Sequence, residues 1–208
     1  MRYYIADQHF YHGNLNDQMD MRGFEDAEKM NEYMIARWNS RVRKNDEVII
    51  LGDFCIAGAK EASEILSRLN GRISLIKGNH DNFLGYRKYN IDRFEWVKDY
   101  AEMHDDGRKV ILCHYPMLSY NGQYRLDKSG RPKTYMLYGH VHDTHDERLI
   151  TEFERITRKT MIKGFDGEDK NIPCNMINCY CKYSDYTPLT LDEWIEITQK
   201  RRQNIKGD

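Results

Sequence analysis

The stretch Val48-Ile49-Ile50-Leu51-Gly52-Asp53 decides how this chain folds. Four consecutive apolar residues, three of them β-branched, predict a short strand that is covered on both faces, as in a parallel sheet. The glycine lets the backbone turn sharply after the strand. The aspartate that follows therefore places a carboxylate directly at the strand's end.

Four further clusters follow the same arrangement, each at the end of a predicted strand. They are Asp7-Gln8-His9, Gly78-Asn79-His80-Asp81, His114 and Gly139-His140-Val141-His142. Strands of one sheet can bring their ends together in space although they are far apart in sequence. Such a gathering of imidazoles, carboxylates and an amide is large enough to hold two metal ions, and it predicts metal-assisted hydrolysis.

The segments between the clusters predict one α/β domain, residues 1–208. Apolar residues recur at helical spacing over 26–42 and 62–69, and Thr190 with Glu193 forms a capping-box pattern before a last helix. Further strands are expected at 3–6, 73–76, 97–103, 110–113, 135–138 and 175–181, a helix at 147–159, and loops at 119–133 and 164–173. The alternation indicates two packed sheets flanked by helices.

Composition excludes several classes of protein. The chain has 208 residues, 31% of them charged, and no apolar run approaches the roughly 18 residues of a membrane-spanning helix. We expect a cytoplasmic protein, because no signal peptide is recognisable and five cysteines do not suit a disulfide framework. The net charge of -1 gives no general attraction to nucleic acid.

The residue types at the clusters indicate which metals and which reaction to expect. Mixed imidazole and carboxylate ligands suit Mn, Fe, Zn, Ni or Co better than Ca or Mg. Two such ions, about 3.5–4 Å apart, can clamp a phosphate and acidify a bridging water to hydroxide. Asp7 and His9 would point the same way in an extended segment. His80 fits the acid that protonates the leaving oxygen, with Asp81 orienting its ring.

The five clusters, in this order, resemble the calcineurin-like metallophosphoesterase superfamily. The match spans about residues 3–142, and GNHD together with GHxH in one chain is highly specific. The resemblance implies a four-layer αββα sandwich with its ligands on loops at one sheet edge. It implies one metal held by Asp7, His9, Asp53 and His142, and a second held by Asp53, Asn79, His114 and His140. Manganese is the metal we expect to support activity in vitro.

Within the superfamily, the opening Asp7-Gln8-His9-Phe10-Tyr11-His12 and the stretch His114-Tyr115-Pro116-Met117 look like small stand-alone bacterial and phage phosphoesterases. The protein serine/threonine phosphatases carry an arginine-containing continuation after GD, which is absent here. The capping domain of the DNA-repair nucleases is not recognisable either. These departures disfavour a phosphoprotein substrate and favour a small phosphate ester or a nucleotide.

Three residues outside the metal set are candidates for substrate binding. His12 could contact substrate beside the first metal, or it could cap the following loop. Tyr124 and Arg125 lie in the loop between His114 and His140, where the arginine could grip a phosphate. Two alternative functions use the same residues: a nuclease, and a non-catalytic scaffold that binds metal.

Overall fold

The computed structural model describes residues 1–85, 93–164 and 167–204. Its first sheet has the order β1-β2-β3-β4, and all its strands are parallel. Its second sheet has the order β10-β7-β6-β5, in which only β5 runs antiparallel. The strands of the two sheets are β1 (Arg2–Ile5), β2 (Glu47–Ile50), β3 (Arg72–Ile76), β4 (Phe94–Lys98), β5 (Tyr100–Asp105), β6 (Arg108–Cys113), β7 (Thr134–Tyr138) and β10 (Met176–Asn178).

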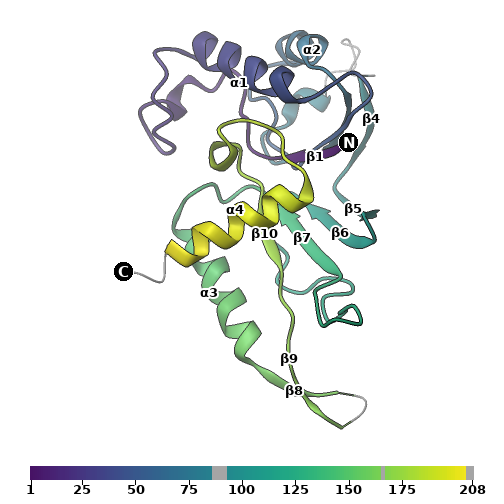
Figure 1. Ribbon diagram of the computed structural model, residues 1–208. Coiled ribbons are helices and arrows are strands. Elements are labelled where there is room, and N and C mark those ends of the chain that lie inside the picture. The colour runs from purple at the N-terminus through teal and green to yellow at the C-terminus, as the bar shows by residue number, and fades with distance from the viewer. Residues whose placement is uncertain (86–92, 165–166, 205–208) are drawn as a thin grey trace.

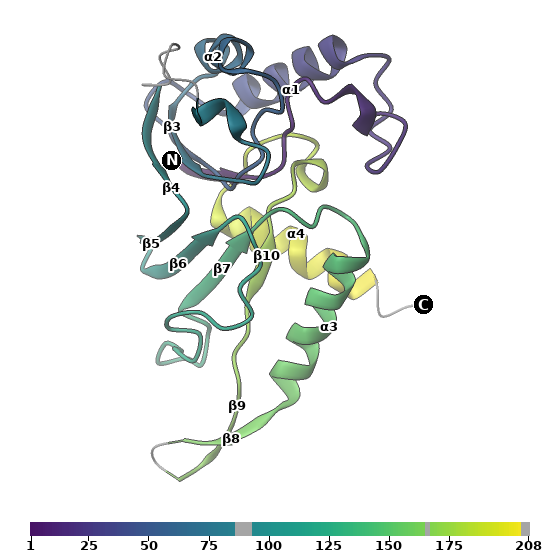
Figure 2. The ribbon, with the colours of Figure 1, turned by 180° about the vertical axis from the view of Figure 1, so that it is seen from behind.

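Helices cover the outer faces of both sheets, as expected for an αββα sandwich (Figures 1 and 2). The helices α1 (Ala27–Arg41) and α2 (Ala59–Arg68) pack on the first sheet through a core that includes Met34, Trp38 and Ile65. Between the sheets lies a second core, with Ile49, Leu112 and Leu137. The helix α3 (His145–Lys159) covers the outer face of the second sheet.

The last helix, α4 (Leu191–Asn204), closes one side of the sandwich. Its Trp194 is fully buried in the core between the sheets and donates a hydrogen bond to the carbonyl of Tyr4 in β1, at 2.8 Å. The predicted capping box is present, because Glu193 accepts hydrogen bonds from the backbone N–H and the hydroxyl of Thr190. No helix within the described ranges is long and apolar enough to cross a bilayer.

Two of the predicted elements were wrong. The expected strand at 97–103 is two strands, β4 and β5, which belong to different sheets. The chain changes sheet at Asp99 without the glycine or proline that usually indicates a turn. The expected loop at 164–173 contains β9 (Asp169–Asn171), paired with β8 (Met161–Lys163). Both of these strands are exposed, so they lack the apolar alternation by which a strand is recognised.

In the described part of the chain, the connections also contain three short 3-10 helices. They are η1 (Gly13–Leu15), η2 (Asn82–Gly85) and η3 (Cys181–Ser184). The chain at the start of η3 joins the two sheets, because the N–H of Ala6 donates to the carbonyl of Cys179 and the carbonyl of Ala6 accepts from the N–H of Cys181. The carboxyl ends of β1 and β10 are thereby held side by side.

Candidate metal centre

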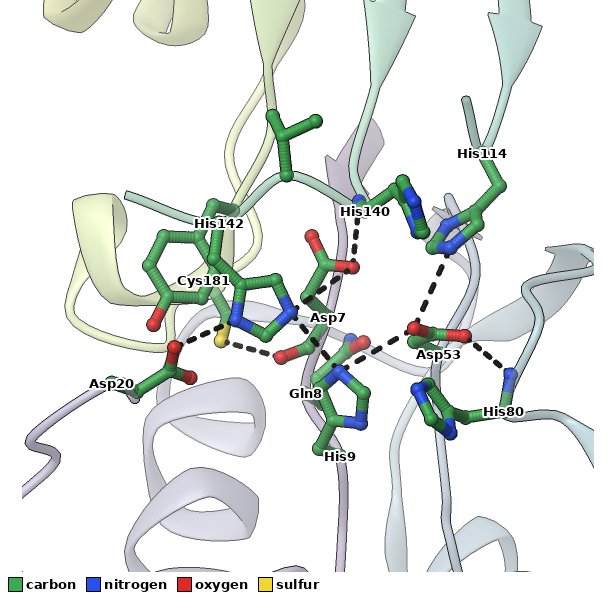
Figure 3. A network of polar contacts seen from close by, with 12 residues as sticks. Asp7, Gln8, His9, Asp20, Asp53, His80, His114, His140, His142 and Cys181 are labelled. Atoms are coloured by element: carbon green, nitrogen blue, oxygen red, sulfur yellow. Dashed lines mark hydrogen bonds and ion pairs between the residues drawn. The ribbon is translucent and has the colours of Figure 1, made fainter. Parts of the chain in front are cut away.

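The predicted ligands meet where strands of both sheets end. Asp7 and Asp53 follow β1 and β2, and Asn79 follows β3. His114 follows β6, and His140 follows β7. Parallel strands end at the same edge of a sheet, so each sheet presents its ligands at one edge. Figure 3 shows the side chains from the two edges facing one another.

One set of possible ligands consists of Asp7, His9 and His142. Their donor atoms all lie within 4.8 Å of one another, and the three side chains are only 0%, 2% and 3% exposed. The Nε2 atoms of His9 and His142 are 3.1 Å apart. That separation fits two ring nitrogens that each lie about 2.1 Å from one ion. This set is hereafter the first donor set.

The second donor set consists of Asp53, His114 and His140, also within 4.8 Å. Asn79 joins it, because its Oδ1 lies 3.1 Å from Nε2 of His114. Oδ2 of Asp53 is 3.5 Å from Nε2 of His114 and 3.5 Å from Nε2 of His9. This carboxylate therefore stands between the two sets, in the place that a ligand shared by two ions would occupy.

The ligand loops depart from regular backbone conformation. Five of the candidate ligands adopt positive φ angles, in the left-handed region that side chains other than glycine seldom enter: Asp7 (58°), His9 (51°), Asp53 (55°), His140 (71°) and His142 (48°). The expected extended segment from Asp7 to His9 is therefore wrong, although both side chains do reach one point. Strain of this kind costs of order 1–3 kcal/mol per residue and is concentrated at functional sites.

Two glycines allow the loops to approach this closely. A Cβ on Gly78 would lie 2.2 Å from Oδ1 of Asp53. A Cβ on Gly52, whose φ is +91°, would lie 2.3 Å from Nδ1 of His114. Any larger residue at either position would displace a candidate ligand.

The electrostatics of the site suit a bound cation. Burial raises the pKa of Asp7 to about 6 and lowers the pKa of His9 well below its ordinary value. Burial would also raise the pKa of Asp53, but His114 and His9 outweigh it and lower that pKa to about 2. Oδ2 of Asp7 and Nδ1 of His9 are buried and have no hydrogen-bond partner among the described residues. A divalent ion would satisfy the unpartnered carboxylate oxygen and offset the cost of burying the acids.

His80 and Asp81 are placed differently from each other. The His80 ring lies at the site, 5.3 Å from the His9 ring between centroids, and its backbone N–H donates to Oδ1 of Asp53. Asp81 does not orient that ring. Its buried carboxylate accepts hydrogen bonds from the backbone N–H groups of Asp53, Phe54 and Gly78, with N···O distances of 2.7–3.0 Å. Asp81 therefore ties the loop after β3 to the loop after β2.

Of the three candidate substrate residues, only His12 lies at the site. The centroid of its ring is 5.4 Å from that of His9. The side chain of His12 makes no capping hydrogen bond to η1, so the capping alternative is wrong. The backbone carbonyl of Arg125 instead accepts a hydrogen bond from the N–H of Lys133. The carbonyl of Lys133 in turn accepts a hydrogen bond from the N–H of Lys109, near the start of β6. Arg125 and the neighbouring Tyr124 thus lie at the amino end of β6 and β7, roughly 15–20 Å from the site at 3.3 Å per residue. The loop length between His114 and Thr134 allows the chain to run back along the strands, which sequence spacing does not reveal.

Three residues at the site went unrecognised in the sequence. Asp20 accepts a hydrogen bond from Nδ1 of His142 at 2.7 Å, and Arg22 pairs with Asp20. Tyr115 contacts the ring of His140, with 4.6 Å between centroids, and remains 47% exposed. Tyr115 could have been inferred from its place next to His114. Nothing in the pattern around Asp20 distinguishes it from an ordinary loop acid.

Comparison with known proteins agrees with this geometry. A family model described as the calcineurin-like phosphoesterase superfamily domain matches residues 5–156. An uncharacterised protein of Methanocaldococcus jannaschii is 30% identical over 200 residues, which cover 95% of this chain and 91% of that protein. The Gene 66 protein of Mycobacterium phage L5 is 29% identical over 192 residues, covering 79% of this chain and 86% of that protein.

A solved structure supports the fold. It is a protein of unknown function from Aquifex aeolicus, with a TM-score of 0.60 and 23% identity over 93% of this chain and 96% of the other. The relatives are small phage and archaeal proteins, in keeping with the stand-alone type that the opening motif indicated. Metal-dependent hydrolysis of phosphate esters is the general chemistry of the matched family. Because the family model covers most of the chain, this protein belongs to the calcineurin-like phosphoesterase superfamily.

Proposed function

We propose that this protein is a dinuclear metal-dependent phosphoesterase that hydrolyses a small phosphate mono- or diester. The observation that carries the proposal is the position of Asp53, whose Oδ2 lies 3.5 Å from a ring nitrogen of each donor set. Asp7, His9, Asp53 and His142 would hold one ion. Asp53, Asn79, His114 and His140 would hold the other.

When bound, the two ions would supply positive charge for the phosphoryl oxygens and make water a stronger acid. The protein's own contribution is to fix the ligands. The backbone N–H of His140 donates to Oδ1 of Asp7 at 2.9 Å, so the loop after β7 is held to the loop after β1. Nδ1 of His114 lies 2.8 Å from the carbonyl of Leu51, which leaves Nε2 of His114 for a metal.

His80 would protonate the leaving oxygen. Its side chain is only half-buried and lies beside the His9 ring, and its backbone N–H is bound to Asp53, so the ring would be accessible to a substrate held at the donor sets. Asp81 contributes by binding the backbone N–H groups of Asp53 and Gly78, which fixes the loops that carry Asp53 and His80. His12, next to the first donor set, would also contact the substrate.

The proposal concerns a single catalytic domain of 208 residues acting in the cytoplasm. The residues that follow the family match support a single domain, since Trp194 of α4 is buried and donates a hydrogen bond to Tyr4 of β1. All five cysteines are free thiols, as suits a reducing compartment. A small ester is favoured over a nucleic acid because the chain carries a net charge of -1. Manganese is the metal we propose for activity in vitro.

The test is an assay of p-nitrophenyl phosphate, its bis ester and a panel of nucleotides, with Mn, Co, Ni or Zn added to metal-free protein. Activity should appear with at least one metal, and Asp53→Asn or His114→Ala should lower it more than about 100-fold, since each removes a ligand. His104→Ala, on the exposed side of β5, is the matched control and should retain activity. If the wild-type protein is silent with every metal and ester, the proposed function is refuted.

A second measurement isolates the role of His80. We expect His80→Ala to lose roughly 10²–10⁴-fold on an alkyl phosphate ester, because an alkoxide leaves only with a proton. The loss on a p-nitrophenyl ester should be much smaller, because that leaving group is stable as an anion. Equal losses on both esters would contradict an acid role for His80.

A further inference from the structure

The two donor sets differ in what lies behind their histidines. In the first set, Nδ1 of His142 lies 2.7 Å from Oδ1 of Asp20, whose side chain is 2% exposed. In the second set, Nδ1 of His114 faces a neutral group, the carbonyl of Leu51. A carboxylate behind a ligating imidazole fixes the ring and makes its other nitrogen a stronger ligand.

Arg22 extends this support to the other ligands of the first set. Its side chain is fully buried and donates from Nε to Oδ2 of Asp20 at 2.9 Å. Its remaining N–H groups donate to the carbonyls of Asp7 at 2.9 Å and Gln8 at 2.6 Å. The same guanidinium thus holds the turn that carries Asp7 and His9 and the carboxylate that orients His142. Figure 3 shows that carboxylate, Asp20, beside His142.

Among the residues that the structure describes, no such carboxylate or guanidinium supports the ligands of the second set. Two of its four possible ligands, Asn79 and His140, are exposed, whereas every ligand of the first set is buried. Asn79 is a neutral ligand, and Asp53 is the only carboxylate that the second set has, shared with the first. The first set has the carboxylate of Asp7 besides the shared Asp53, whereas the charge of Asp20 is offset by its ion pair with Arg22. Attraction to a divalent ion therefore favours the first set, and burial increases that attraction.

We propose that Asp20 and Arg22 form a positioning pair that makes the first donor set the tighter metal site. An ion at the second donor set would then be bound more weakly. The inference rests on the dinuclear centre of the proposed function and adds an order of loading to it. Asp20 touches neither substrate nor the reacting atoms, and it acts through His142.

The test is a titration of metal-free protein with Co²⁺, followed by calorimetry and by the visible absorption of the bound ion. The wild-type protein should bind two ions with affinities that differ at least about 10-fold. His142→Ala should abolish the tighter event, and His140→Ala should abolish the weaker one. Equal affinities, or the reverse assignment, would overturn the proposal.

Asp20→Asn probes the positioning pair itself, because it keeps the shape of the side chain and removes its charge. We expect the tighter event to weaken about 10–100-fold with a changed absorption spectrum, and the weaker event to stay within about 3-fold. Asp20→Glu should recover part of the loss. Asp17→Asn, an exposed acid three residues earlier, is the matched control and should leave both events unchanged.

The outcomes of this titration are independent of the ester assays. Equal weakening of both events in Asp20→Asn, or none in either, would refute the positioning role even if the enzyme is active. Two unequal sites in a protein that cleaves no ester would refute the proposed function and leave the order of loading standing. Melting of the metal-free variants distinguishes a general loss of folding from a specific loss of metal.

Discussion

At the scale of single residues, the five sequence clusters and the family resemblance named the residues that the structure brings together in the two donor sets. That these residues bind metal stays a prediction. The backbone conformation was not predictable, because positive φ angles at His9 or Asp53 arise from contacts between loops. Asp20 was missed for the same reason, since its partner His142 is 122 residues away.

A prediction at this scale concerns Gly78. We expect Gly78→Ala to lower metal affinity at least about 10-fold, because the added Cβ would lie 2.2 Å from Oδ1 and 2.4 Å from the backbone N of Asp53. Gly85→Ala is the control, since a Cβ there meets nothing within 4 Å. Metal content after dialysis against a limiting Mn²⁺ concentration measures the difference. Equal content in both variants would show that the close approach is unimportant.

A second prediction concerns Asp81. Its buried carboxylate accepts three backbone N–H groups, and Asp81→Asn would turn an NH₂ group toward those donors. We expect a loss of about 2–3 kcal/mol in the free energy of unfolding of the metal-free protein. Urea denaturation measures it, with Asp17→Asn as the exposed control. A loss below about 0.5 kcal/mol would indicate that the two loops do not depend on this carboxylate.

At the scale of helices and strands, apolar periodicity predicted what is buried and failed where nothing is buried. The helix α1 and the strand β2 were recognisable because their apolar residues face a core. The strands β8 and β9 expose all six residues, so the pattern carried no signal. In α3 the buried positions are acidic, which apolar periodicity does not predict. Its fully buried positions are Glu147 and Glu154, which pair with Arg201 and Arg202 of α4.

The capping box of α4 gives a pH-dependent prediction. Burial alone would raise the pKa of Glu193, but hydrogen bonds from Thr190 and the charge of Arg41 outweigh it, so the pKa lies below its ordinary value of 4.5. A lowered pKa means that folding favours the ionised form. The stabilisation is therefore complete above about pH 4.5 and is lost as the pH falls through the folded-state value.

Glu193→Ala should accordingly cost about 1 kcal/mol in the free energy of unfolding at pH 7, a typical value for a helix cap. The difference from the wild-type protein should shrink at pH 3. Glu196→Ala, which removes only an exposed pair with Lys200, is the control and should cost about 0.3 kcal/mol. A cost for Glu193→Ala that is the same at both pH values would argue against the ionised cap.

At the scale of the whole molecule, the αββα architecture followed from the order of the elements and from the motif resemblance. The sequence could not reveal where the long connection 119–133 runs. Arg125 was therefore expected at the metal centre but lies at the other end of β6 and β7. Fold-level inference placed the strand ends correctly, since parallel strands leave little choice, whereas the path of a loop depends on contacts that no local pattern encodes.

Metal binding should stabilise the folded chain as a whole. An ion present at 100 times its dissociation constant adds about 2.7 kcal/mol per site, which corresponds to roughly 5–10 °C in Tm for a chain of this size. We expect Mn²⁺ to raise Tm by that amount and EDTA to reverse it. Mg²⁺, which ligates imidazole poorly, should have little effect. A Tm that is indifferent to Mn²⁺ would mean that no ion binds the folded state preferentially.

Each donor set takes ligands from both sheets, with His9 from the first and His142, 133 residues later, from the second. A bound cation would therefore act as a reversible cross-link that closes a very long stretch of chain. Unlike a disulfide, which persists in the unfolded chain, the ion would stabilise by binding the folded state and would be released on unfolding. The protein would obtain this restraint without an oxidising environment, and a chelator could release it.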